Sequence, residues 1–214
     1  MRSDSRKRAR AQFLCPWVEQ ADCLLDLHYM HEPDAPLLLT EVLPCNIALA
    51  QRLGAPQYVI VDAGHKEGVL MRDFGRFGQA DQDQACALLI ECGFHGDPAS
   101  RDVGCDMVAR LLLDAGTLHA DDIPAGWLLP EPAEQRVLEV TDAVVAPSMN
   151  VCFSQKWHGL ETLEKAGSVI GWADDKPVVT PYNMRTLIMP SLCQLKLGVT
   201  VVHLARDYRA ASKA

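Results

Sequence analysis

The sequence predicts an α/β sheet domain followed by a small all-β domain. Two apolar runs, at 57–64 and 85–93, are typical of strands that are buried on both faces of a sheet. Helical patterns alternate with these runs, which is the arrangement of α/β domains. After residue 135 the chain changes to short β-rich pieces separated by Gly, Pro and Asp, which indicates an all-β appendage of about 75 residues.

The N-terminal region predicts two helices with a short strand between them. Four apolar residues give the first helix its amphipathic spacing: Phe13, Leu14, Trp17 and Val18. Pro16 should interrupt this helix, because proline lacks the backbone N–H that bonds to the preceding turn. The apolar run 23–30 follows as a strand, and 41–54 predicts a helix that ends at Gly54.

The middle of the chain predicts a long loop and a second strand–helix unit. Residues 64–84 contain four glycines in no regular period, and long loops inside compact domains tend to be functional. After the strand at 85–93, Asp97 and Pro98 open a helix that Gly116 closes. Three prolines and a glycine then mark a linker. The predicted division is a sheet domain, a linker and a β-domain, at 1–122, 123–135 and 136–208.

Composition excludes several classes of function. The 214 residues are 49% hydrophobic and carry a net charge of −8, so a broad surface for nucleic acids or anionic membranes is not expected. The basic run at 2–10 is not followed by the apolar segment of a secretory signal, and no apolar stretch is long enough to span a membrane. The eight cysteines form no C-x-x-C pair, which favours reduced thiols in a cytoplasmic protein.

Two strand ends carry polar side chains that are suited to chemistry. Asp26 and His28 point to the same face of their strand, and an imidazole that a carboxylate orients is a good metal ligand. The alternative is a histidine held at the edge of the core by one hydrogen bond. Glu91 interrupts an apolar run, and burying a carboxylate there costs several kcal/mol unless it is paired or neutralised. Such a group can take a proton from water, although a structural role in capping a loop is the alternative.

Four segments in this order give the sequence a specific resemblance. They are DCLLDLHYMHEPDAPLLL, YVIVDAGHKEGVLMRDFGRF, ALLIECGFHGD and VVTPYNMRTLIMPS, and they resemble the succinylglutamate desuccinylase/aspartoacylase family over nearly the whole chain. The resemblance implies part of a zinc carboxypeptidase-like α/β domain at 1–122, followed by a β-domain that narrows the active-site entrance. It also implies hydrolysis of the amide bond of N-acyl amino acids with Zn²⁺, in which His28 is a zinc ligand and Glu91 the catalytic base.

The chain departs from the family's pattern before Asp26. Family members carry a His-x-x-Glu pair that gives the first two zinc ligands, and the residues before Asp26 contain no histidine. A catalytic zinc normally has three protein ligands and a water. We therefore expect an N-terminally truncated domain. His158 and Glu161 have the spacing of the absent pair, which we expect to be coincidental, and we expect His31 at the rim of the site.

Four further residues are candidates for substrate binding. Arg72 and Arg76 in the glycine-rich loop could hold a substrate carboxylate through two hydrogen bonds, with exposure to solvent as the alternative. His95 could line the pocket, with an exposed loop position as the alternative. Tyr182 could reach the mouth of the site from the β-domain, with a structural turn as the alternative.

Three hypotheses about function follow. The first is a zinc-dependent deacylase that acts on a small N-acyl amino acid and has no nucleic-acid or membrane partner. The second is a truncated, non-catalytic chain, and the third is a binding module that retains the acyl-amino-acid pocket. The acyl group, the amino acid and the oligomeric state stay open, and the sequence is compatible with a homo-oligomer. Asp62 and His65 receive no role.

Overall fold

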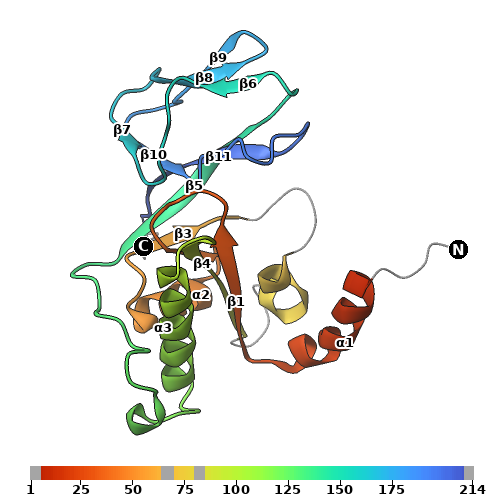
Figure 1. The fold of residues 1–214 in the computed structure, drawn as a ribbon, viewed down its shortest axis with the longest axis vertical. Coiled ribbons are helices and arrows are strands. Elements are labelled where there is room, and N and C mark those ends of the chain that lie inside the picture. Colours follow the sequence, from red (N-terminus) through yellow and green to blue (C-terminus); the bar gives the residue numbers. More distant parts are fainter. Residues whose placement is uncertain (1–5, 64–69, 80–84, 210–214) are drawn as a thin grey trace, which may run out of the picture.

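The computed structural model describes residues 6–63, 70–79 and 85–209. They form one eight-stranded sheet, in the order β1-β4-β2-β3-β5-β11-β10-β7, and one three-stranded sheet, β6-β8-β9 (Figure 1). Helices accompany strands β1–β4, within residues 23–94, and together they form the α/β part. Strands β5–β11, within residues 136–207, form the β-rich part. The α/β class predicted from the sequence is therefore confirmed.

The elements have the following bounds. The helices are α1 (Arg6–Gln20), α2 (Pro44–Leu53) and α3 (Ala99–Asp114), with short 3-10 helices η1 (Met71–Asp73), η2 (Gly75–Gly78) and η3 (Ala120–Asp122). The strands are β1 (Cys23–Met30), β2 (Leu37–Thr40), β3 (Tyr58–Val61), β4 (Cys86–Phe94), β5 (Arg136–Val145), β6 (Val151–Phe153), β7 (Thr162–Leu163), β8 (Val169–Ala173), β9 (Lys176–Val179), β10 (Arg185–Ile188) and β11 (Thr200–Asp207). Every helix and strand predicted upstream of the linker is present.

Helices α2 and α3 cover one face of the larger sheet. Leu49 of α2 and Met107 of α3 pack with Leu88 and Ile90 of β4 in one buried apolar cluster. Gly54 ends α2 in the left-handed conformation, with a φ of 69°, as the sequence predicts. The alternate residues of β4 therefore point to the other face, away from these helices.

That other face packs against the β-rich part of the chain. Leu37 of β2, Ile60 of β3 and Leu138 of β5 form a second buried cluster with Ile188 of β10. Strand β5 pairs with β3 on one side and with β11 on the other, so one sheet connects the two parts of the molecule. The boundaries proposed for the linker and the β-domain stay a prediction.

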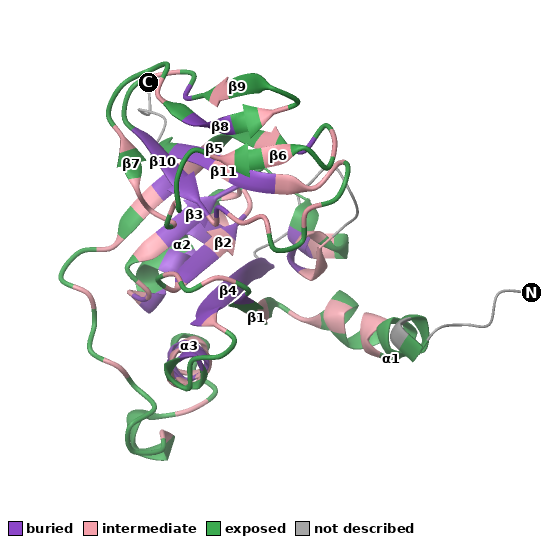
Figure 2. Ribbon diagram, turned by 45° about the horizontal axis from the view of Figure 1, so that its top comes forward, coloured by how far each residue is buried: buried purple, intermediate pink, exposed green. Residues whose placement is uncertain are grey.

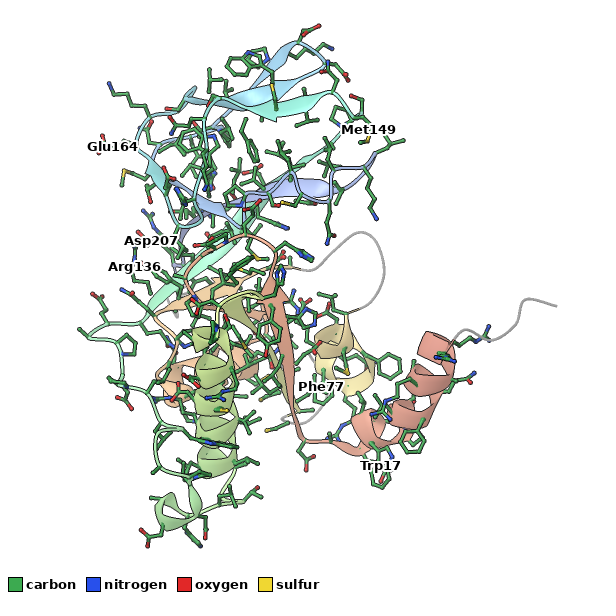
Figure 3. The ribbon with its side chains drawn as sticks, in the orientation of Figure 1. Trp17, Phe77, Arg136, Met149, Glu164 and Asp207 are labelled. Carbon is green, nitrogen blue, oxygen red and sulfur yellow. The ribbon has the colours of Figure 1, made fainter. Side chains whose placement is uncertain are left out.

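Helix α1 continues through Pro16, so the predicted interruption is wrong. The helix projects from the body of the molecule, and Phe13 and Trp17 are largely exposed (Figure 3). Because water surrounds most of this helix, solvent can bond to the backbone carbonyl for which Pro16 has no N–H. Proline therefore costs less here than it would in a buried helix.

The centre of the predicted long loop is among the described residues. Residues 70–79 contain η1 and η2, and Phe77 is buried against Ala85 and Ala87 at the start of β4. The remaining parts of this loop, 64–69 and 80–84, lie outside the described residues, and His65 is among them. None of the described helices is both long enough and apolar enough to span a membrane.

Candidate functional site

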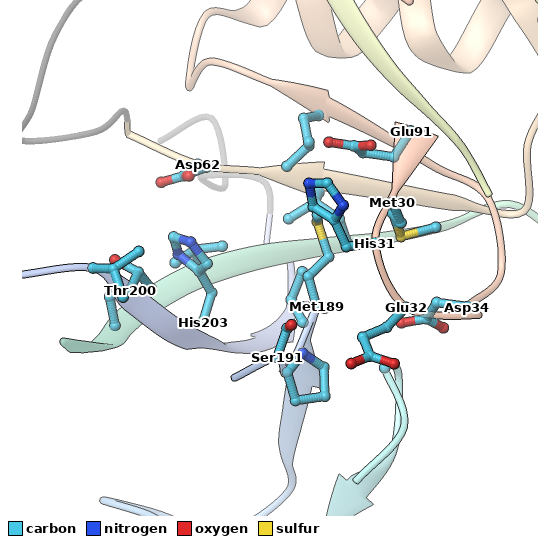
Figure 4. A pocket seen from close by; sticks show the side chains of 18 of the residues that line it. Met30, His31, Glu32, Asp34, Asp62, Glu91, Met189, Ser191, Thr200 and His203 are labelled. Carbon is cyan, nitrogen blue, oxygen red and sulfur yellow. The ribbon is translucent and has the colours of Figure 1, made fainter. Parts of the chain in front are cut away.

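A pocket of about 990 Å³ lies between strands β1–β4 of the larger sheet and the β-rich part (Figure 4). His28, Leu89 and Glu91 line it where the parallel strands β1 and β4 approach their carboxyl ends. Met189 and His203 line it from the β-rich part. Open α/β sheets place ligand sites at the carboxyl ends of their strands, so this pocket is the candidate site.

Glu91 is a buried acid in this pocket. The residue is 7% exposed, and its Oε2 has no hydrogen-bond partner among the described residues. Burial raises the pKa of its carboxyl group; the nearby His28 opposes this shift and Asp26 adds to it. Gly93 follows with a φ of 113°, and a Cβ there would lie 2.9 Å from Ser100 Oγ. Glycine thus allows β4 to pass close to α3 two residues after Glu91.

His28 lies opposite Glu91 in the pairing of β1 with β4. Its Nε2 is 3.2 Å from Asp26 Oδ2, and its Nδ1 is 4.0 Å from Glu91 Oε1. The hydrogen bond with Asp26 raises the pKa of His28, while partial burial works against this shift. The structure therefore brings together the three polar residues that the sequence singled out on two separate strands.

Arg72 is a buried cation in the same pocket. The residue is 1% exposed, and its Nε lies 3.2 Å from Asp73 Oδ1. None of its guanidinium nitrogens has a hydrogen-bond partner among the described residues. Leaving these donors unsatisfied costs free energy, and a carboxylate that accepts two hydrogen bonds would recover it. Arg72 is thus suited to hold an anionic group.

Glu41, directly after β2, belongs to the surroundings of this arginine. Burial, a hydrogen bond with Asp73 and repulsion from Asp73 raise the pKa of Glu41 to about 7, while Arg72 opposes the shift. Asp62, which lines the pocket, adds further repulsion. The neighbourhood of Arg72 is therefore crowded with carboxyl groups, and one of them titrates near neutral pH.

The segment 31–34, which follows β1, contacts the β-rich part beside the pocket. Gln194 donates a hydrogen bond to His31 Nε2. Asp34 accepts a hydrogen bond from the backbone N–H of Gly159, and a Cβ on that glycine would come within 1.5 Å of Asp34 Oδ2. A larger residue at 159 would require the Asp34 side chain to move, so Gly159 allows the β-rich part to lie against this segment. His31 lines the pocket, as expected for a residue at its rim.

Three of the predicted substrate-binding residues do not line the pocket. His95 Nδ1 lies 3.2 Å from the carbonyl oxygen of Met30, which ties the ring to the end of β1. Arg76 forms an ion pair with Asp22 at 3.5 Å. Among the predicted arginines, only Arg72 faces the candidate site.

The third residue, Tyr182, reaches the pocket only through a neighbour. Its hydroxyl forms a hydrogen bond with Thr141 Oγ1, and Thr141 lines the pocket. The buried guanidinium of Arg185 stacks on the tyrosine ring. Tyr182 is thus held by Thr141 and Arg185 of the β-rich part and does not itself line the pocket.

The β-rich part contributes residues that the sequence did not indicate. Trp157, Met189 and Ser191 line the pocket from loops, and His203 lines it from β11 (Figure 4). His203 interrupts an apolar strand in the same way as Glu91, so this signal was present in the sequence. The loop residues carry no such signal, because only tertiary packing brings their loops over the ends of β1 and β4.

The described residues do not form a zinc site by themselves. Within 6–63, 70–79 and 85–209, no group of three or more His, Cys, Asp or Glu side chains is arranged to hold a metal ion. His158 does line the pocket, but Glu161 accepts a hydrogen bond from its backbone N–H at 2.5 Å. One histidine does not supply the three protein ligands of a catalytic zinc. The zinc ion implied by the resemblance therefore does not fit these residues alone.

Comparison with solved structures identifies the fold, although no family model and no curated protein matches the sequence. The succinylglutamate desuccinylase from Vibrio parahaemolyticus superposes with a TM-score of 0.67 at 15% identity, over 98% of this chain and 63% of that chain. The succinylglutamate desuccinylase/aspartoacylase from Rhodobacter sphaeroides gives a TM-score of 0.65 at 17% identity, over 97% and 65%. The chain has the succinylglutamate desuccinylase/aspartoacylase fold.

Other proteins with the desuccinylase/aspartoacylase fold also match. The product-bound ectoine utilization protein EutE from Ruegeria pomeroyi superposes with a TM-score of 0.65 at 14% identity, over 96% of this chain and 64% of that chain. The resemblance carried by the four sequence segments is thus confirmed at the level of the fold. This chain spans less than two thirds of the length of these three structures.

Proposed function

We propose that the pocket binds an N-acyl amino acid and that the protein acts in hydrolysis of its amide bond. Glu91 is the group that transfers the proton, and Arg72 holds the carboxylate of the amino acid. One observation carries this proposal: the same pocket is lined by a buried acid with an oxygen that accepts no hydrogen bond from the described residues, and by a buried guanidinium that donates none to them. The desuccinylase/aspartoacylase fold supports the same class of substrate.

The chemistry assigned to Glu91 is proton transfer. Hydrolysis consumes one water and one amide and yields a carboxylic acid and an amine. Glu91 accepts a proton from the attacking water and returns it to the nitrogen of the leaving amine. Because burial raises its pKa, Glu91 is a stronger base than an exposed carboxylate.

The role of Arg72 is tested by calorimetric titration with N-succinylglutamate and N-acetylaspartate. We expect the free acids to bind and their methyl esters to bind at least about tenfold more weakly, because the esters lose a charge-assisted pair of hydrogen bonds. Arg72→Gln should weaken binding of the acids by a similar factor. Arg76→Gln is the matched control and should bind as the wild type does, since Arg76 lies outside the pocket.

The comparison between acid and ester uses the wild-type protein, so it holds even if Arg72→Gln is poorly folded. Equal binding of acids and esters would rule out a carboxylate anchor. Release of free amine from the same compounds measures hydrolysis, and Glu91→Gln should reduce its rate at least about a hundredfold. Hydrolysis that survives this substitution would exclude Glu91 as the proton-transfer group.

A second candidate function is a binding module that holds the acylated amino acid without turnover. The observation that favours it is that the described residues provide no three-ligand metal group beside Glu91. The same two measurements separate the candidates. Binding of the free acids without release of amine supports the binding module, and binding with release supports the deacylase.

A further inference from the structure

Three carboxyl groups lie near the buried guanidinium of Arg72. Glu41 directly follows β2 and Asp62 directly follows β3, and these two strands pair in parallel, so both carboxyl groups leave the sheet at the same edge. Asp62 lines the pocket (Figure 4), and Asp73 is the neighbour of Arg72 in η1. A side-chain hydrogen bond between Glu41 and Asp73 ties η1 to the end of β2.

Asp73 pairs with Arg72 without using its hydrogen-bond donors. Arg72 Nε lies 3.2 Å from Asp73 Oδ1, yet this oxygen accepts no hydrogen bond from the described residues, and the guanidinium donates none to them. The planar guanidinium can therefore still bind a carboxylate through two hydrogen bonds. Asp73 thus stabilises the charge of Arg72 and leaves its N–H groups to a ligand.

The charge of this cluster opposes a bound anion. Arg72 carries one positive charge, whereas Glu41, Asp62 and Asp73 carry three negative charges when all are ionised. An anion on Arg72 adds a fourth, at a site where burial reduces screening by water. Glu41 is the group suited to lose its charge, because burial and then Asp73 raise its pKa to about 7, while Arg72 opposes the shift.

We propose that Glu41 takes up a proton from solvent, shared with Asp73, when an anionic group binds to Arg72. Neither Glu41 nor Asp73 lines the pocket, so both act through Arg72 and do not touch the ligand. The anion partly cancels the positive charge that keeps Glu41 ionised, and the hydrogen bond with Asp73 holds the added proton. The inference rests on the role of Arg72 in the function proposed above.

This exchange links the affinity for the ligand to pH. Well below pH 7 Glu41 is already protonated in the free protein, so binding takes up no further proton. Above pH 7 each bound anion takes up as much as one proton, so the affinity falls with rising pH by up to about tenfold per unit. The ligand does not cause this slope, because carboxyl groups of N-acyl amino acids titrate near pH 4.

Calorimetric titration with N-succinylglutamate, in buffers of low and high ionisation enthalpy, measures the proton uptake. At about pH 7.5 we expect the wild-type protein to take up about half a proton through Glu41, and Glu41→Gln to lose this share. Glu91 and His28 are unchanged in the variant, so any uptake at these groups stays. Glu164→Gln is the matched control, since Glu164 is exposed and does not line the pocket.

The affinity supplies a sign that a merely structural role would not. Glutamine imitates the protonated form of Glu41, so Glu41→Gln should bind N-succinylglutamate as the wild type does at about pH 6, and at least about fivefold more tightly at about pH 8.5. Asp73→Asn should reduce the proton uptake, because loss of the Asp73 charge lowers the pKa of Glu41. Weaker binding of Glu41→Gln at both pH values would overturn the proposal.

NMR of the glutamate carboxyl carbons follows Glu41 directly, and Glu41→Gln identifies its resonance. The midpoint should lie near pH 7 in the free protein and at least about one unit higher with saturating N-succinylglutamate. An unchanged midpoint, or an uptake that Glu41→Gln fully retains, would overturn this inference and leave the carboxylate anchor intact. Equal binding of acids and esters would overturn the anchor and the inference together.

Discussion

Strands β1 and β4 lie side by side in the same sheet, yet they have opposite surroundings. They run parallel, His28 faces Glu91 in the pairing, and both are rich in leucine or isoleucine. All residues of β4 except Phe94 are buried, whereas most of β1 is exposed or half-buried (Figure 2). An apolar strand sequence therefore does not predict how deeply the strand is buried. Its burial depends on the elements that pack around it in the folded protein.

The difference has a chemical consequence for the two site residues. β4 has a strand on each side and packing on both faces, so burial is the main cause of the raised pKa of Glu91. Among the described strands β1 pairs only with β4, and a hydrogen bond with Asp26 has a larger effect on the pKa of His28 than burial does. On β4, desolvation is the main cause of the raised pKa of Glu91. On β1, a polar contact is the main cause of the raised pKa of His28.

Truncation of a leucine on each strand should show the largest contrast. Leu88 of β4 is fully buried among residues of α2 and α3, and Leu88→Ala should lower the free energy of unfolding by about 2–5 kcal/mol. Leu27 of β1 is 43% exposed, and Leu27→Ala should cost about 1 kcal/mol or less. Urea unfolding followed by circular dichroism measures both. Equal losses would mean that β1 is buried in solution.

Substitution of the two site residues sharpens the comparison. Glu91→Gln removes a buried charge whose pKa is raised, so we expect it to increase the free energy of unfolding at pH 7 by about 1 kcal/mol. His28→Gln should decrease it slightly, because a hydrogen bond with Asp26 is lost at a half-exposed site. Thermal unfolding at pH 7 gives both signs. A destabilised Glu91→Gln variant would show that the carboxylate has a partner in solution.

Glu41 extends the comparison to β2, on the other side of β4. Its pKa is raised from 4.5 to about 7, so the folded state binds more protons than the unfolded state between these values. Wild-type stability should fall as pH rises through this window, and Glu41→Gln should not share that part of the loss. We expect the variant to match the wild type below pH 4.5 and to exceed it by about 1 kcal/mol above pH 7, after allowance for solvent screening. Melting temperatures from pH 4 to 8 measure the effect, and a constant difference would contradict it.

The smallest effect is expected for metal content. Because His28 is the sole predicted ligand and the described residues form no three-ligand group, purified protein should hold well under one zinc per chain. His28→Ala should leave the measured zinc unchanged. Elemental analysis of dialysed protein checks both. Stoichiometric zinc that His28→Ala removes would show that His28 acts with ligands outside the described residues.

Local sequence signals were sufficient for the elements of the α/β part. The helix that ends at Gly54, the strand around Glu91 and the helix that follows Pro98 are all present as predicted. Capping residues and apolar periodicity act over a few residues, so they can be read from the chain. The interruption at Pro16 was predicted wrongly, because the exposure of α1 to solvent depends on what lies around the helix.

The sequence by itself determined which polar side chains stand at strand ends: His28 with Asp26 on one strand, and Glu91 on another. Alternation along a strand and the cost of burying a charge are local rules. Only the tertiary structure decided that these groups share one pocket, that Arg72 faces it while Arg76 does not, and that β1 lies beside β4 in the sheet. Those facts depend on strand order and on the packing of distant loops, which no local pattern encodes.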